Sequence, residues 1–337
     1  MSSSLTAAVP ALTAILPTWD TFEAIRTTVS HLRAQTIAGE IELIICAPAA
    51  DRVRYDPLDV VGLQSVRVLE TGEWHATGPA RAMAIRMASA PIVAFCEDHC
   101  YPFPDWAEAL LAAHRESHAA VGPAFYNANP STTSWADFYV GYGRWLAPGQ
   151  RRELALLPGH NTSYKRNLLL DFGDDLGRLM EAETMLLWDL RRQGYTLLME
   201  PAARVMHTNF ARPLVFLHVQ WHLGRVFGAV RAGKWHSGRR MAYAVASPAI
   251  PLIRLGHVSR TVLESRLPIG QFIVSLPMTL AGLIADAVGQ ARGALFGPGR
   301  SVDLLAAYEF HRAEVNRTGR RPHLDPAFNG GREEKAR

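Results

Sequence analysis

Two consecutive acids and a histidine, Glu97-Asp98-His99, stand between the apolar run PIVAFC (91–96) and a turn at 102–106 that contains two prolines and a tryptophan. The apolar run is typical of a strand, and the prolines indicate a turn into a new helix. Oxygen ligands grouped at a strand end suit Mg²⁺ or Mn²⁺, and such an ion in turn neutralises a diphosphate. An acidic turn that begins a helix is the alternative interpretation.

The residues before this segment predict the sheet that positions it. Short apolar, β-branched runs alternate with helical patterns, which is typical of βαβ units on a mainly parallel sheet. We expect strands at 12–16, 41–47, 65–70 and 91–97, with helices over 21–36 and 78–89. Because ligands of such sheets bind beyond the carboxyl ends of the strands, the candidate site residues are those of 17–20, 46–51, 70–72 and 97–99.

The chain changes character along its length. A helix over 104–117, a strand at 119–125, a polar loop at 127–134, a helix over 179–193 and a strand at 196–201 are expected next. Beyond residue 213, stretches rich in Arg, Gly and Trp lead into apolar segments that contain prolines. The sequence thus predicts an α/β domain followed by a helical region.

The composition excludes several classes of protein. With 337 residues, 48% of them hydrophobic and 20% charged, the chain is long and apolar enough for a large core, which excludes disorder and collagen. Its 3 cysteines form neither a disulfide framework nor a Cys-x-x-Cys metal pair, so a cytoplasmic location is expected. The apolar opening lacks the Lys or Arg of a signal peptide, so we expect no secretory leader.

Basic residues gather in one stretch, 204–240, which contains Lys and Arg but no Asp or Glu. Such a stretch ahead of apolar segments suits a membrane surface or phosphate groups. Aromatic residues interleaved with basic ones do not recur elsewhere, so nucleic acid is not an expected partner.

Five motifs, taken together, resemble the inverting family 2 glycosyltransferases, whose fold is the GT-A nucleotide-diphospho-sugar transferase fold. They are AILPTWD (14–20), GPAR (78–81), FCEDHCYPFPDW (95–106), PGHNTSYKR (158–166) and EAETMLLWDLRRQGYTLLMEPAARVMH (181–207). They occur in the family's order and cover about 200 residues of the 337. The resemblance implies a mostly parallel, Rossmann-like sheet.

The resemblance also implies a donor site and a metal site. Donor-binding residues would be Pro17, Thr18, Asp20, Arg81, Glu97 and Asp98. The metal, Mn²⁺ or Mg²⁺, would be held by Asp98, His99 and His207, with His99 where the family's Asp-x-Asp motif has a ligating acid. A histidine in that place favours Mn²⁺ or a weaker dependence on Mg²⁺. For His207, a purely structural role is the alternative.

Catalysis and acceptor binding follow from the same alignment of motifs. Glu183 would be the base that removes the proton of the acceptor hydroxyl, which an inverting reaction needs. Glu181 is the rival position, and favourable acids in the first turn of a helix are the structural alternative. Gly159, His160 and Asn161 would bind the acceptor.

One departure from the family concerns the donor base. Most members end the second strand with Asp-Asp-Gly-Ser, whose first acid recognises the base, whereas this chain has Cys46-Ala47-Pro48-Ala49. Base recognition then has to come from elsewhere, with Asp51, Thr18 and Arg81 as candidates. The usual inference to a uridine donor is therefore weakened.

The last hundred residues leave three interpretations open. Leu267–Ala285 is a 19-residue run without charge, but it contains two prolines. Short helices at the membrane interface, a membrane span, or a soluble helical region whose apolar faces form a homodimer would each fit. We expect a GT-A domain at 1–212, a helical membrane-interface region at 213–325 and a flexible tail at 326–337.

These observations predict an enzyme of polysaccharide biosynthesis. It would move a single sugar from a nucleotide-diphosphate sugar to a glycan or lipid-linked acceptor, such as a polyprenyl-diphosphate-linked glycan, at the cytoplasmic face of the membrane. The alternative is a catalytically degenerate GT-A protein that binds nucleotide sugar or lipid without turnover, because the acids of strand two are lost.

Overall fold

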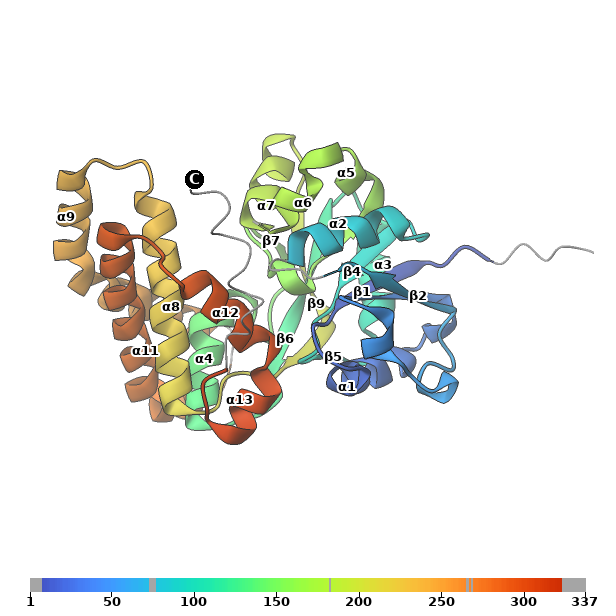
Figure 1. The fold of residues 1–337 in the computed structure, drawn as a ribbon, viewed down its shortest axis with the longest axis horizontal. Helices are drawn as coiled ribbons and strands as arrows, with labels where there is room; N and C mark the ends of the chain where they lie inside the picture. The colour runs from blue at the N-terminus through green and yellow to red at the C-terminus, as the bar shows by residue number, and fades with distance from the viewer. Residues whose placement is uncertain (1–7, 73–76, 182, 265–266, 268, 323–337) are drawn as a thin grey trace, which may run out of the picture. The chain divides into compact units, whose positions relative to one another are not determined.

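The structure is a computed structural model, and it describes residues 8–72, 77–181, 183–264, 267 and 269–322. The predicted tail at 326–337 lies outside these residues. The chain divides into two compact units (Figure 1). Unit 1 comprises the residues up to 126 and those of 147–206, and unit 2 comprises 127–146 and the residues from 207 onward.

Four parallel strands form one half of the sheet in unit 1. They are β1 (Leu12–Pro17), β2 (Ile41–Ala47), β3 (Ser65–Glu70) and β4 (Ile92–Phe95), in the order β3-β2-β1-β4. Leu12 pairs with Ile41 on one side and with Ile92 on the other. Strands β2 and β4 are buried along their whole length, which explains why their sequences are apolar apart from Glu42. The buried Glu42 carboxylate accepts hydrogen bonds from the Thr13 hydroxyl and the Ser89 N–H.

The other half of the sheet is mixed. It continues from β4 through β8 (Ser163–Lys165), β6 (Ala120–Asn127) and β9 (Leu197–His207) to β5 (Cys100–Pro102), and β7 (Arg152–Glu153) pairs with β9. Strand β8 runs antiparallel to both of its neighbours. Strand β9 is longer than predicted, because buried and more exposed residues alternate after Pro201, as in a half-buried strand.

Helices α1 (Phe22–Arg33), α2 (Thr77–Met87) and α3 (Trp106–His114) connect the strands of unit 1, near their predicted places. Between β8 and β9 lie α5 (Arg166–Leu170), α6 (Leu176–Glu181) and α7 (Glu183–Arg192), in the region where a helix was predicted over 179–193. Glu183, the predicted base, belongs to α7.

Unit 2 is helical. It contains α4 (Thr132–Tyr142), α8 (Pro213–Ala232), α9 (Ser237–Ala246), α10 (Ile250–Glu264), α11 (Ile269–Phe296), α12 (Ser301–Phe310) and α13 (Arg312–Thr318). Helix α4 occupies part of the predicted polar loop, and its N-terminus is capped by the Ser131 hydroxyl, which accepts a hydrogen bond from the Ser134 N–H at 3.1 Å. Phe210, Phe216 and Tyr308 are central to its core.

Helices α8 and α11 pack with their backbones close together. A Cβ atom added to Gly224 or Gly228 of α8 would lie 2.0 Å from the Asp286 carbonyl oxygen or 2.1 Å from that of Gln290. Gly289 and Gly293 of α11 meet the backbone of α8 in the same way. Each helix thus carries two glycines four residues apart, the spacing that lets two helix backbones approach.

The prediction of short, proline-broken helices in 267–285 is wrong. Residues 269–296 form the single helix α11, with Pro277 inside it. This helix is long and apolar enough to cross a membrane, and 44% of its most apolar stretch is buried within the protein. The predicted fold class, a mostly parallel α/β domain followed by a helical region, is confirmed.

Candidate active site

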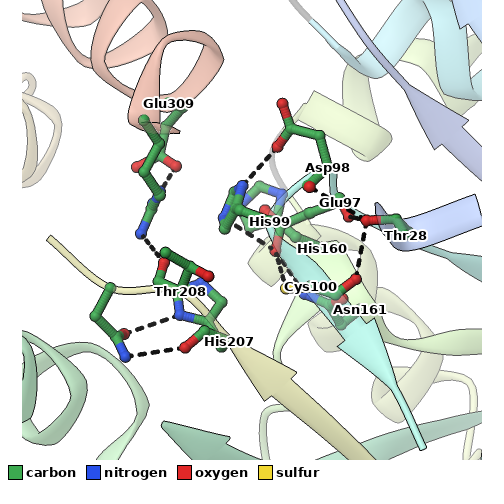
Figure 2. A network of polar contacts seen from close by, with 12 residues as sticks. Thr28, Glu97, Asp98, His99, Cys100, His160, Asn161, His207, Thr208 and Glu309 are labelled. Carbon is green, nitrogen blue, oxygen red and sulfur yellow. Dashed lines mark hydrogen bonds and ion pairs between the residues drawn. The ribbon is translucent and has the colours of Figure 1, made fainter. Parts of the chain in front are cut away.

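The turn between β4 and β5 carries the acids and the histidine of residues 97–99 (Figure 2). Thr28 of α1 holds this turn, because its hydroxyl lies 3.1 to 3.2 Å from the carbonyl oxygens of Glu97, Asp98 and Cys100. Thr28 is itself fully buried. A side chain of the first helix therefore fixes the backbone from which the site residues project.

The side chains of this turn contact one another. His99 is buried, and its Nδ1 atom lies 2.6 Å from Asp98 Oδ1, while its Nε2 atom lies 3.8 Å from Glu97 Oε2. The Cys100 thiol donates to Glu97 Oε2 at 3.3 Å. The ligand atoms of Glu97, His99 and Cys100 all lie within 4.8 Å of one another. We call Glu97, Asp98, His99 and Cys100 the acidic turn.

A second cluster surrounds Glu183. Arg81 of α2 is buried, and its guanidinium forms an ion pair with Glu183 Oε1. The His160 Nδ1 atom lies 3.2 Å from the same oxygen and 3.1 Å from Arg81 Nη2. The Arg81 guanidinium also lies over the Phe95 ring, 5.2 Å from its centre. We call Arg81, His160 and Glu183 the Glu183 cluster.

Gly159 gives Glu183 its place. A Cβ atom on residue 159 would lie 1.8 Å from Glu183 Oε2 and 2.7 Å from Glu183 Cβ. Only a residue without a side chain therefore lets the short helical turn at 159–161 pack against the start of α7. The glycine that the sequence suggested for close approach to a substrate makes a close approach to the predicted base.

Charges within the Glu183 cluster shift the pKa values of Glu183 and His160. Burial would raise the pKa of the Glu183 carboxyl, but the charges of His160 and Arg81 outweigh burial and lower that pKa. The Glu183 carboxylate raises the pKa of His160 to about 9. Because 57% of the His160 side chain is exposed, water screens its attraction to Glu183 and so limits the rise of the His160 pKa. Glu183 is thus ionised at neutral pH.

Asn161 joins the two clusters. It is buried, and its amide nitrogen donates to Glu97 Oε2 at 2.6 Å. Its neighbour His160 contacts Glu183, so two consecutive residues reach the acidic turn and the predicted base. Residues predicted to bind donor, acceptor and metal, together with the predicted base, therefore meet in one region of unit 1.

A match to a known family covers the part of the chain that holds most of this site. Residues 13–172 match the family model of glycosyl transferase family 2. This segment is a family 2 glycosyl transferase domain. It contains the acidic turn, Arg81 and His160, whereas Glu183 lies beyond it. The family implies a nucleotide-sugar donor and a glycan acceptor, and the fold class is that of the GT-A glycosyltransferases.

Solved structures similar to the chain include GalNAc-T7 with UDP, GalNAc and Mn²⁺ (12% identity, TM-score 0.42), a mycobacterial protein (16%, 0.41) and S. aureus TarS (14%, 0.45). The matches cover 59%, 62% and 84% of this chain. They cover 44%, 70% and 55% of those chains, so the chain spans less than two thirds of GalNAc-T7 and of TarS. No curated protein matches the chain.

The residues after β1 of the glycosyl transferase domain have local contacts. The Thr18 N–H donates to the Cys46 carbonyl oxygen at 2.8 Å, which ties the ends of β1 and β2 together. Asp20 is exposed, and its carboxylate accepts from the Thr21 N–H at 2.8 Å at the start of α1. Pro17 ends β1. A donor-binding role for these three residues stays a prediction.

The acidic turn offers a donor set that fits a divalent cation. Two atoms that bind one ion at about 2.1 Å can lie up to about 4.2 Å apart, so His99 Nε2 and Glu97 Oε2, at 3.8 Å, could share one. The Asp98 carboxylate holds the other ring nitrogen of His99, an arrangement common for histidine ligands. An imidazole and a thiol are soft donors for Mg²⁺, so the set suits Mn²⁺ better.

His207 is the last residue of β9 and the first residue of the second segment of unit 2. Its ring nitrogens lie 2.8 Å from the Tyr142 hydroxyl and 2.8 Å from Asn209 Oδ1, both in the same unit. His207 is fully buried. Contacts at both ring nitrogens agree with a purely structural role for His207. Its role as a metal ligand stays a prediction.

Two residues of the site were missed by the sequence reasoning. Cys100 was considered only as a disulfide or Cys-x-x-Cys candidate, although its place directly after His99 at a strand end was a usable signal. Thr28 lies in the middle of an amphipathic helix, 69 residues before Glu97 in the sequence. Nothing in the local pattern distinguishes it from other buried helix residues.

Proposed function

We propose that the protein is an inverting glycosyltransferase that moves a single sugar from a nucleotide-diphosphate sugar to a lipid-linked glycan at the cytoplasmic face of the membrane. The observation that carries this proposal is the ionised Glu183, whose side chain is 11% exposed, beside Arg81 and His160 and joined through Asn161 to the acidic turn. A carboxylate for the acceptor proton and a charged turn for the donor diphosphate are the two parts that such a transfer needs.

In this proposal, Glu183 accepts the proton of the acceptor hydroxyl as the bond between sugar and phosphate breaks. Its low pKa makes it a weak base in the protein alone. An acceptor hydroxyl that displaces His160 from Glu183 would remove one of the two charges that lower this pKa, and would so strengthen the base. His160 is suited to move, because more than half of its side chain is exposed.

The leaving diphosphate is the second part of the proposal. When Mn²⁺ or Mg²⁺ is bound by residues of the acidic turn, the ion neutralises the charge that develops on the diphosphate. Glu97 and His99 are the residues whose geometry supports this role. Asp98 orients His99 through the contact at 2.6 Å.

A degenerate member that binds nucleotide sugar without turnover is the second candidate. It is favoured by Cys46, which stands where most family members have a base-recognising acid and which is fully buried. Burial raises the pKa of this thiol to about 12, so it carries no charge with which to replace the acid. The ionised Glu183 favours the enzyme.

The first test is a screen of nucleotide-diphosphate sugars whose nucleosides are uridine, guanosine and thymidine. Each donor is added with Mn²⁺, Mg²⁺ or a chelator, and the melting temperature and hydrolysis of the donor are measured. One donor should raise the melting temperature in the presence of metal, because a ligand at 100 times its Kd stabilises a protein by about 2.7 kcal/mol. The same donor should be hydrolysed slowly. Stabilisation without hydrolysis or transfer would support the degenerate alternative, and stabilisation by none would contradict the donor site.

Two variants make this test specific to the acidic turn. Asp98→Asn should lose metal-dependent donor binding, because an amide holds the His99 ring less strongly than a carboxylate does. His99→Asp should shift the preference from Mn²⁺ towards Mg²⁺, because it replaces a soft donor with a hard one. Donor binding that is indifferent to chelator in the unmodified protein would contradict the metal proposal.

Membrane association is supported by the basic stretch 204–240 and by exposed apolar side chains on α9 and α10, among them Val245 and Leu252. The protein should sediment with vesicles of anionic lipid and be partly released at high salt. The reason is that each surface Lys or Arg contributes about 1 kcal/mol, which ions screen. A protein that stays in the supernatant and elutes as a dimer would contradict this and support the homodimer interpretation.

A further inference from the structure

Unit 2 contains a cavity of about 880 Å³ that the proposed transfer site does not use. It lies among α8, α9, α10 and α11, with the end of α4 at one side. Its volume is in the range of sites for small molecules, roughly 300 to 1,000 Å³. Every lining residue belongs to unit 2.

Most of the wall is apolar. Leu223 and Phe227 of α8 line the cavity together with Ala246, Ile250 and Ile253. The surface of α9 and α10 is also apolar, since Val245 is 73% and Leu252 70% exposed. An occupant should therefore have an apolar body, and this surface suits an occupant that arrives from a lipid layer.

A chain of polar groups crosses one side of the cavity. Arg254 of α10 forms an ion pair with Asp286 of α11 at 2.6 Å, and the Gln290 amide donates to the same carboxylate at 2.7 Å. The Tyr243 hydroxyl of α9 donates to the side-chain oxygen Oε1 of Gln290. Asp286 and Gln290 are both buried. The charge of Arg254 is thus neutralised within the protein.

Arg231 gives the lining of the cavity an excess positive charge. It is exposed at the cavity wall, where its guanidinium lies 5.4 Å from the centre of the Tyr243 ring and 5.9 Å from that of Phe227. In the described part of the chain, Arg231 forms no ion pair with a carboxylate. The lining therefore contains two guanidinium groups and one carboxylate, and the excess charge is positive.

An apolar cavity with one uncompensated guanidinium complements an amphiphile with a negative head. A guanidinium can bind a phosphate with two parallel hydrogen bonds. A nucleotide or a free sugar is too polar for these walls, and a free phosphate would leave the apolar part unfilled.

We propose that this cavity binds a lipid phosphate, with its isoprenoid or acyl chain between α8 and α10 and its phosphate at Arg231. As a site for the lipid part of the acceptor it rests on the proposed function. The binding itself involves no sugar transfer and is measured separately.

The test uses the full-length protein and calorimetric titration with farnesyl phosphate, farnesol and inorganic phosphate. Farnesyl phosphate should bind more tightly than either part alone. Arg231→Gln should weaken it about tenfold, which corresponds to about 1.4 kcal/mol, and should leave farnesol binding unchanged. Arg260→Gln is the matched control, because Arg260 lies on α10 outside the cavity and pairs with Glu264.

A second pair of variants tests the cavity itself. Ala246→Trp places a large side chain at an exposed position in the wall and should abolish binding of farnesyl phosphate. Ala242→Trp adds the same side chain at an exposed position of α9 outside the wall and should not change it. Equal binding by both tryptophan variants, or equal binding of farnesol and farnesyl phosphate, would overturn the proposal.

Two further arms separate the sources of the lipid and the two proposals. Tighter binding of a short-chain phosphatidylglycerol than of farnesyl phosphate would keep the cavity as a phospholipid site and overturn its link to the acceptor. Donor hydrolysis is measured on the same variants. If Ala246→Trp binds lipid normally and the protein still hydrolyses the donor, only the cavity proposal is contradicted. If the protein binds lipid but no donor, only the glycosyltransferase proposal is contradicted.

Discussion

Replacing Glu183 by glutamine should lower sugar transfer by about two orders of magnitude or more and leave donor binding within a few-fold of the unmodified protein. Glutamine keeps the size of the side chain and its contact with the backbone at Gly159, but it cannot accept a proton. The measurement is transfer to the acceptor under saturating donor, compared with the affinity for the donor.

The same substitution has a second readout that does not depend on knowing the acceptor. The Glu183 carboxylate is the main cause of the raised pKa of His160, so Glu183→Gln should lower that pKa towards the ordinary value of about 6.5. An NMR titration of His160 measures this directly. The contribution of the pair to stability should be complete between the ordinary pKa values of a carboxyl and an imidazole, about 4.3 and 6.5. It should be lost as the pH rises through the raised pKa of His160, and also as the pH falls through the lowered pKa of Glu183.

Two control variants make the result interpretable. Asp189→Asn changes a carboxylate to an amide on the same helix, where Asp189 pairs only locally with Arg192, and it should leave transfer unchanged. Glu181→Gln tests the rival position for the base. Loss of transfer in Glu181→Gln with normal transfer in Glu183→Gln would show that the assignment of the base is wrong.

The parallel half of the sheet could be predicted because local sequence determines it almost alone. Strands β1, β2 and β4 are buried on both faces, so all their residues except Thr13 and Glu42 are apolar. Strands β2 and β3 match their predicted bounds. Helix α4 was not predicted, because its first residues, Thr132 to Ser134, are of types that favour turns until the capping Ser131 is recognised.

The candidate site was predictable only as a set of separate motifs. The strand ends and the family's order of motifs gave Glu97, His160 and Glu183 as candidates, but no spacing predicts which of them touch. The ion pair of Arg81 with Glu183 joins residues 102 positions apart, and the bond of Asn161 to Glu97 joins residues 64 apart. Such contacts depend on how the helices pack on the sheet, which local patterns do not encode.

The second large effect is expected in unit 2, where Gly228→Ala should lower the free energy of unfolding by about 3 kcal/mol. The added Cβ would lie 2.1 Å from the Gln290 carbonyl oxygen and 2.7 Å from Gln290 Cα. These atoms belong to the backbone of α11 and cannot rotate away, so α8 and α11 would have to separate. Alanine stabilises a helix by up to about 1 kcal/mol relative to glycine, and this gain is smaller than the cost of separating the two helices. Thermal melting followed by circular dichroism measures the change.

Gly256→Ala is the matched control, since Gly256 lies inside α10 and a Cβ added there meets no atom within 4 Å. It should stabilise the protein by about 1 kcal/mol through helix propensity alone. The two variants add the same methyl group to helices of the same unit and should change stability in opposite directions. If Gly228→Ala melts at the same temperature as Gly256→Ala or above it, α8 and α11 are not in backbone contact. In that case, the four glycines at 224, 228, 289 and 293 do not hold the two helices together.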